Sequence, residues 1–297
     1  MGSTTVKSIK AWVAATRLHT LPVSVAGVIG AMALSMTAPA FRWLPGVLCL
    51  VFAILCQVAS NFANEYFDWR AGLDRPGREG FRRGVTEGDI SPRAMLVATI
   101  VTLSVACCVG LALIPFGGWW LIGVGVVVAL GALAYSAGPY PLSHHGLGEV
   151  AVIVFFGIVP VTMTYYLMTG SKPTADAVAA SVAIGLMGAN VLIVNNYRDI
   201  DDDRAAGKRT LAVKFGRTAM ETLYLFNGYI AIGLMVPFWS LTSPVAWIIP
   251  GLYLVVHTIL YFSLVRHRGA ALNPLLGKTA LAMVAYCAAL FLYTLLR

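Results

Sequence analysis

The stretch from Asn61 to Asp74 reads NFANEYFDWRAGLD and continues the end of a long apolar run. A second stretch, from Asn195 to Asp203, reads NNYRDIDDD and also follows an apolar run. Both contain the pattern N-x-Y-x-D, at residues 64–68 and 195–199. On a helix, residues three or four positions apart lie on one face. The sequence therefore predicts two polar stripes, each at the end of an apolar helix.

Composition places these stripes in a membrane protein. Of the 297 residues, 59% are hydrophobic and only 11% are charged, and the mean hydropathy is +0.79. A soluble domain has about a quarter of its residues charged. Apolar runs of about 20 residues, long enough to cross a bilayer, recur along the chain. We expect a single all-α domain over residues 1–297, with nine spans at about 11–36, 44–66, 92–115, 118–136, 147–169, 175–197, 219–240, 244–265 and 274–296.

Lysine and arginine are distributed unevenly among the expected loops. Of the 21, only Arg42, Lys172 and Arg297 fall on one side of the membrane. The two most basic loops follow the second and sixth spans, and the first of them includes Arg75 and Arg78. Because basic loops stay in the cytoplasm, the N-terminus and both stripes are predicted to be cytoplasmic and the C-terminus outside. This asymmetry accounts for the net charge of +8 without a nucleic-acid partner.

The stripes have the composition of a site for a hard cation. Their candidate metal ligands are Asn64, Glu65, Asp68, Asp74, Asp199 and Asp203. Oxygen-rich sets of this kind select Mg²⁺. The simpler alternative is an acidic, solvated loop. It does not explain why the stripes begin inside apolar helices, where an ionised carboxylate costs about 2.5–3.5 kcal/mol at the membrane centre.

Basic residues adjoin both stripes, which favours a diphosphate bridged by the metal. The candidates for phosphate contact are Arg82, Arg83, Arg198, Lys208 and Arg209. The alternative is that these cations only set the topology. The carboxamides of Asn61, Asn195 and Asn196 add further hydrogen-bonding groups to the same mouth.

The two motifs, with the continuation RAAGKRTLA after Asp203, resemble the UbiA-type superfamily of intramembrane aromatic prenyltransferases. Within it, the resemblance is closest to the branch that prenylates 1,4-dihydroxy-2-naphthoate in menaquinone biosynthesis. The segments that fit this branch are RLHTLP (17–22), PYPLSHHGLGE (139–149) and AGKRTLAVKFGR (206–217). The resemblance covers nearly the whole chain.

The resemblance implies nine helices around a central cavity, with cytoplasmic cap loops at about 67–92, 137–147 and 198–218. It also implies a bacterial inner-membrane enzyme that transfers a polyprenyl chain from its diphosphate to the naphthoate with loss of CO₂. In this scheme Asp68, Asp199, Lys208 and Arg209 are catalytic, because acids hold Mg²⁺ against the diphosphate and cations neutralise its leaving charge. The partners are the polyprenyl diphosphate, the aromatic acceptor and the lipid bilayer.

Four further residues are candidates for contact with the substrates. Arg17 and His19 are expected to meet the carboxylate of the acceptor, although Arg17 also suits a topogenic charge. The rings of Tyr135 and Tyr140 are expected to shield a carbocation, or else to be interface aromatics. One departure concerns Glu65, which stands where the family usually has Asp. Its extra methylene displaces the carboxylate, so it would ligate a metal differently.

Two alternatives remain open at this point. Another acceptor, such as 4-hydroxybenzoate, homogentisate or a lipid, would use the same acids and cations. A cation-coupled transporter would also place acids within membrane helices. A transporter is expected to spread its polar groups through the midplane, whereas here both stripes fall on one side.

Overall fold

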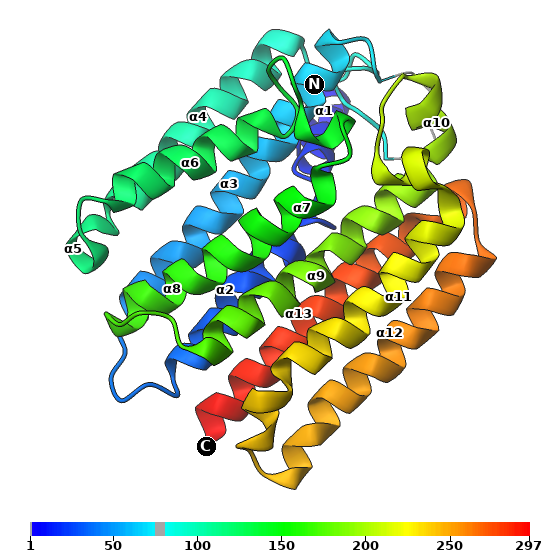
Figure 1. Cartoon of the computed structure of the whole chain (residues 1–297). Helices are drawn as coiled ribbons and strands as arrows, with labels where there is room; N and C mark the ends of the chain where they lie inside the picture. Colours follow the sequence, from blue (N-terminus) through cyan, green and yellow to red (C-terminus); the bar gives the residue numbers. More distant parts are fainter. Residues whose placement is uncertain (1, 75–80) are drawn as a thin grey trace.

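The computed structural model describes residues 2–74 and 81–297, and every regular element within them is helical. Arg75 and Arg78 lie outside the described residues. The long helices run side by side in one bundle, with the two ends of the chain at its opposite ends (Figure 1). The longer helices are α1 (Gly2–Ala15), α2 (Leu21–Ser35), α3 (Trp43–Arg70), α4 (Pro92–Leu111), α6 (Leu121–Ala134), α8 (Val159–Thr169), α9 (Ala175–Arg198), α11 (Leu211–Ser240), α12 (Ile248–Arg266) and α13 (Asn273–Leu296).

Among the described residues, seven helical segments are long and apolar enough to cross a membrane. They are Trp43–Arg70, Pro92–Leu111, Gly148–Thr169, Ala175–Arg198, Leu211–Ser240, Pro244–Arg266 and Gly269–Leu296. The other two expected spans coincide with shorter apolar helices, α2 and α6, of 15 and 14 residues. The prediction of an all-α integral membrane protein is confirmed, and nine full-length spans are not.

The expected span at 11–36 is not one helix. It is divided into α1 and α2 by a turn at residues 16–20. Arg17 has a φ of 51° there, the left-handed conformation that non-glycine residues rarely adopt. Pro22 lies in the first turn of α2, where its missing N–H costs no hydrogen bond. The break brings Arg17 to the end of the bundle where α3 and α9 finish.

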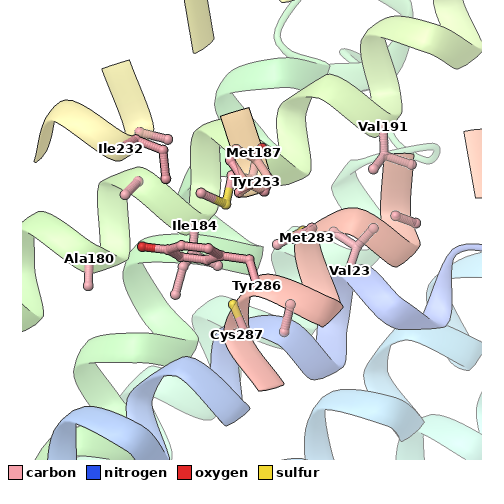
Figure 2. Close-up of a cluster of buried hydrophobic side chains, with 14 of the residues drawn as sticks. Val23, Ala180, Ile184, Met187, Val191, Ile232, Tyr253, Met283, Tyr286 and Cys287 are labelled. Atoms are coloured by element: carbon pink, nitrogen blue, oxygen red, sulfur yellow. The ribbon is translucent and has the colours of Figure 1, made fainter. Parts of the chain in front are cut away.

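Helix α9 lies in the middle of the bundle and packs against α2, α8, α11 and α13. It also meets the π-helical turn η2 (Ile153–Ile158) at very short range. A Cβ on Gly157 would lie 2.3 Å from the Ser181 carbonyl oxygen, so only glycine permits this approach. Figure 2 shows core side chains that converge around α9, among them Val23, Ile184, Met187, Val191, Ile232, Tyr253, Met283 and Tyr286.

Short elements cluster at the polar end of the bundle. Helix α9 ends at Arg198, and Asp199 (φ −90°, ψ 9°) separates it from α10 (Ile200–Ala205). Gly207, with φ 76°, then turns the chain towards α11. The segment between α6 and α7 (Gly148–Val152) contains one turn of 3-10 helix, Leu142–His144. These segments fall in the ranges predicted as loops at 137–147 and 198–218, but α10 and the start of α11 make much of the second range helical. Their role as caps stays a prediction.

Candidate active site

The ends of α3 and α9 bring the two predicted stripes together around one polar pocket of about 160 Å³. Its wall includes eleven of the residues singled out from the sequence: Arg17, Asn61, Asn64, Asp68, Arg83, Tyr135, Asn195, Asn196, Asp199, Asp203 and Lys208. The stripes are far apart in the sequence, so their meeting depends on the packing of the two halves of the bundle. The pocket combines carboxylates, carboxamides and cations at one end of a membrane protein.

Asp68 is buried and receives two cationic or polar partners from other segments. The Lys208 ammonium lies 3.2 Å from its Oδ2 atom, and His144 Nε2 lies 3.2 Å from its Oδ1 atom. Lys208 Nζ is also 3.9 Å from Asp203 Oδ1. The ammonium therefore stands between a carboxylate of the first stripe and a carboxylate of the second.

Asp199 is held by its neighbour in the sequence. The guanidinium of Arg198 forms two parallel bonds with it, from Nε to Oδ1 at 2.6 Å and from Nη2 to Oδ2 at 2.8 Å. The same guanidinium donates to Asn195 Oδ1 and to Asn273 Oδ1. Arg198 is 4% exposed and does not line the pocket. In this structure it orients Asp199 and Asn195, and its predicted contact with phosphate stays a prediction.

Asn64 links the first stripe to Arg17. Arg17 Nη2 donates to Asn64 Oδ1 at 2.6 Å, and Asn64 Nδ2 donates to Ser136 Oγ at 2.7 Å. A left-handed residue costs roughly 1–2 kcal/mol relative to the right-handed form. Strain of this size persists where surrounding contacts impose it, often at functional sites. The hydrogen bond to Asn64 places the guanidinium of Arg17 beside a residue of the pocket wall.

Two of the predicted metal ligands, Glu65 and Asp74, do not line the pocket. Glu65 is 1% exposed, and its Oε1 accepts a hydrogen bond from the backbone N–H of Val85 at 2.9 Å. Asp74 Oδ2 lies 3.4 Å from Nε of Arg83. Both acids thus contact the segment that follows residue 80. Their binding of metal stays a prediction.

The remaining donor set fits a hard cation in its chemistry. Asp68, Asp199 and Asp203 supply carboxylate oxygens to one pocket, and Asn64 adds a carboxamide. Across the part of the chain that is described, no three His, Cys, Asp or Glu side chains are close enough together to hold a metal ion. In this structure the ammonium of Lys208 lies close to both Asp68 and Asp203, at 3.2 and 3.9 Å.

His19 lies beside the pocket wall without lining it. Its ring stacks on Phe81 with centroids 3.9 Å apart. Burial, followed by the charges of Arg17 and Arg198, lowers the pKa of His19 to about 4. The predicted contact of His19 with the acceptor carboxylate stays a prediction.

Three other candidates also lie outside the pocket wall. Tyr140 is exposed, and its ring stacks on His145 with centroids 3.6 Å apart. Arg82 is exposed and pairs with Asp89 at 2.8 Å. Arg209 donates its backbone N–H to the carbonyl of His144 at 2.7 Å. The predicted contacts of these three side chains with substrate remain untested.

Sequence reasoning missed a polar residue one turn before Asn61. Gln57 donates from Nε2 to Thr20 Oγ1 at 3.1 Å and to Asn61 Oδ1 at 3.3 Å, and its Oε1 accepts from Ser24. The signal was present, since residue 57 extends the spacing of the first stripe by four positions. His144, the partner of Asp68, carried no comparable signal because loop histidines are usually solvated.

An apolar cavity of about 340 Å³ continues from the polar pocket. The two share Gln57, Ser60, Tyr135 and Phe156 in their walls. Much of the rest of the apolar wall comes from α3, α4, α6 and the segment from η2 to α8. Tyr135 therefore lies where the two cavities join. The site as a whole suits a molecule with a charged head and a hydrocarbon tail.

Residues 21–274 match the UbiA prenyltransferase family. The chain belongs to the UbiA prenyltransferase family. It is 34% identical to a 1,4-dihydroxy-2-naphthoate octaprenyltransferase of Mycobacterium tuberculosis over 95% of this chain and 96% of the relative. It is 37% identical to the enzyme of the same name from Escherichia coli, over 70% of this chain and 69% of that one. The resemblance inferred from the two motifs is confirmed.

Solved structures of family members share the fold of this chain. A UbiA homologue from Archaeoglobus fulgidus bound to DMAPP and Mg²⁺ superposes with a TM-score of 0.67 at 15% identity, over 95% of this chain and 99% of that one. An apo UbiA homologue from Aeropyrum pernix gives a TM-score of 0.70 at 16% identity, over 93% and 98%. At this identity the likeness shows the fold alone.

Proposed function

We propose that this UbiA-family protein transfers a polyprenyl chain from its diphosphate to 1,4-dihydroxy-2-naphthoate, with loss of CO₂, to give demethylmenaquinol. The observation that carries the proposal is the junction of the polar pocket with the apolar cavity. A polyprenyl diphosphate has this division into a charged head and an apolar tail. The relatives named for the naphthoate reaction support the choice of acceptor.

The acids of the pocket would hold Mg²⁺ through Asp68, Asp199 and Asp203, with Asn64 as a neutral oxygen donor. Bound Mg²⁺ would supply positive charge against the diphosphate and so stabilise it as a leaving group. Lys208 lies between the two stripes and is placed to move onto phosphate oxygens when the carboxylates take the metal. Arg83 adds a second cation to the same wall.

Charge on the leaving diphosphate develops as the allylic C–O bond breaks. Cations and a metal fixed beforehand around that charge lower the barrier without reorganising at the moment of reaction. The carbon that becomes electron-poor would lie where the polar pocket joins the apolar cavity. The face of Tyr135 at this junction would shield it.

Arg17 would hold the carboxylate of the acceptor. Arg17 lines the pocket, and its guanidinium donates there to Asn64. A guanidinium pairs with a carboxylate through two parallel hydrogen bonds. This contact would present the ring carbon that bears the carboxylate to the electron-poor carbon of the prenyl chain.

We also propose that the pocket opens to the cytoplasm across a bacterial inner membrane. The basic residues gather at the same end as the stripes, as the positive-inside rule requires of a cytoplasmic face. The two ends of the chain lie at opposite ends of the bundle (Figure 1), in keeping with an outside C-terminus.

An acceptor assay tests this function. Purified protein is given Mg²⁺, a polyprenyl diphosphate and either 1,4-dihydroxy-2-naphthoate or 4-hydroxybenzoate, and prenylated product, CO₂ and pyrophosphate are measured. Product and CO₂ from the naphthoate alone support the proposal. Product from the benzoate alone contradicts the acceptor and keeps the prenyl transfer. The absence of both product and pyrophosphate contradicts the reaction itself.

A further inference from the structure

Glu149 is a buried acid that the proposed mechanism leaves without a role. It lies in the first turn of α7 and is 4% exposed. Its Oε1 accepts a hydrogen bond from Asn196 Nδ2 at 2.9 Å, whereas its Oε2 has no hydrogen-bond partner among the described residues. No lysine or arginine of those residues forms an ion pair with it. A buried acid is costly in a membrane segment and usually has a function there.

The bond to Glu149 fixes the orientation of the Asn196 side chain. A carboxamide has a donor end and an acceptor end, whereas an ionised carboxylate only accepts hydrogen bonds. In the structure the Nδ2 end of Asn196 is turned towards Glu149 and donates to its Oε1, so the Oδ1 end of the carboxamide is turned away from this acid. Asn196 lines the polar pocket and Glu149 does not. Among the described residues, the hydrogen bond with Asn196 therefore links Glu149 to the pocket wall.

Asn196 differs from the other carboxamides of the pocket wall in its oxygen. The side-chain oxygens of the other four each accept a hydrogen bond. Gln57 accepts from Ser24 and Asn61 accepts from Gln57, while Asn64 accepts from Arg17 and Asn195 accepts from Arg198. The Oδ1 atom of Asn196 accepts none from the described residues. Among the five carboxamides of the wall, Asn196 is thus the one whose side-chain oxygen accepts no hydrogen bond from the described residues.

The proposed acceptor carries such donors, since it is a dihydroxylated ring. The new C–C bond would form at the ring carbon that bears the carboxylate, while the allylic C–O bond breaks and its electron pair leaves with the diphosphate. The electron pair of the C–CO₂ bond returns to the ring when CO₂ departs. No ring proton is removed, so the site needs a hydrogen-bond acceptor for the ring hydroxyl rather than a base for the ring carbon.

We propose that Glu149 is a positioning residue that holds the Asn196 oxygen towards the pocket, where it accepts a hydrogen bond from a hydroxyl of the aromatic acceptor. This inference rests on the proposed function, which supplies the hydroxylated ring. The hydrogen bond leaves more electron density on the ring and so favours attack on the prenyl carbon.

The test compares wild-type protein with Glu149→Gln in steady-state transfer. Glutamine has the same shape but can donate as well as accept, so the Asn196 carboxamide is free to turn over. We expect KM for the naphthoate to rise about tenfold, which corresponds to about 1.4 kcal/mol. KM for the polyprenyl diphosphate should change less than about twofold. Asn196→Ala should likewise raise KM for the naphthoate and leave KM for the polyprenyl diphosphate nearly unchanged.

Two acceptor analogues, each with one ring hydroxyl replaced by methoxy, test the hydrogen bond directly. If Glu149 served only packing, its replacement would not change the preference between these analogues. Wild-type protein should disfavour one of them by about tenfold, and Glu149→Gln should lose that discrimination. The matched control is Asn227→Ala, which removes a buried carboxamide bond from Asn227 Nδ2 to Asn190 Oδ1, 3.0 Å long and outside both cavities. It should lower thermal stability and leave both KM values unchanged.

The double variant Glu149→Gln/Asn196→Ala tests whether Glu149 acts through Asn196. If Glu149 acts through Asn196, the double variant matches Asn196→Ala, because the two effects are not additive. Additive losses overturn the inference, as does an unchanged KM for the naphthoate in Glu149→Gln or Asn196→Ala. If the glutamine variant does not fold, Asn196→Ala and the methoxy analogues decide alone. Absence of naphthoate product from wild-type protein instead overturns the proposed function, and with it the ligand assigned to Asn196.

Discussion

The two acidic stripes share a sequence pattern, and the structure supports them in different ways. Asp68 of the first stripe is neutralised from across the pocket by Lys208, and His144 of another segment lies at hydrogen-bonding distance from it. Asp199 of the second stripe is neutralised by Arg198, the residue directly before it. Similar motifs therefore specify similar positions for the carboxylates without specifying how each carboxylate is held.

This difference bears on how the pocket would take up a metal. The partner of Asp68 is an ammonium on a flexible stem, which can leave its carboxylate for a phosphate. The partner of Asp199 is a buried guanidinium with bonds to three side chains. In the proposed mechanism the second stripe is thus fixed in advance, and the first would change its partner when substrate binds.

Replacement of the two aspartates separates catalysis from folding and has the largest expected effect. Asp68→Ala and Asp199→Ala should each lower kcat/KM by about 10³-fold or more, because both remove charge that would hold the metal. Only Asp199→Ala should also lose stability, by about 3–5 kcal/mol, since it leaves the Arg198 guanidinium buried without its carboxylate. Thermal unfolding in detergent measures the second effect. Equal stability of the two variants would contradict the comparison.

Lys208 is expected to have the next largest effect. Lys208→Met removes the exchangeable cation, so kcat should fall about 10- to 100-fold and KM for the diphosphate should rise. The matched control is Lys172→Met, in the segment that precedes α9, at the other end of that helix from the pocket. Steady-state kinetics with varied diphosphate check both variants. Near wild-type kinetics in Lys208→Met would show that the ammonium does not move onto phosphate.

Glu65 tests how many acids of the first stripe reach the metal. Its Oε1 accepts from the Val85 N–H, away from the pocket. Glu65→Gln keeps an oxygen for this bond, so we expect less than about a tenfold loss of kcat/KM and an unchanged Mg²⁺ concentration at half-maximal rate. A large rise in that concentration would establish Glu65 as a ligand.

Asp201 should show the smallest effect of the acids in the second stripe. The pKa of Asp201 is lowered by its hydrogen bond and ion pair with Arg217, and Arg204 acts in the same direction. Its contribution to stability is therefore full above the ordinary aspartate pKa and is lost as pH falls through the lowered value. The pair is exposed and contributes about 0–1 kcal/mol. Asp201→Asn should leave activity unchanged and shift thermal unfolding slightly at pH 7, with no shift near pH 2.

The all-α membrane fold and the meeting of the stripes could be predicted from the sequence. Apolar runs fix the helices, and the shared spacing around Asp68 and Asp199 places both at helix ends on the basic side. The left-handed turn at Arg17, the rotation of Glu65 towards Val85 and the bond between Asn196 and Glu149 could not be predicted. Each depends on packing between segments that are distant in the sequence, and no local periodicity encodes it.

The central claim is that both stripes form one site for a metal-bound diphosphate. The most direct measurement is calorimetric binding of an unreactive polyprenyl thiodiphosphate, with and without Mg²⁺, to wild-type protein, Asp68→Ala and Asp199→Ala. We predict Mg²⁺-dependent binding to wild-type protein and its loss in each variant. Binding that is independent of Mg²⁺, or that either variant retains in full, would contradict the claim.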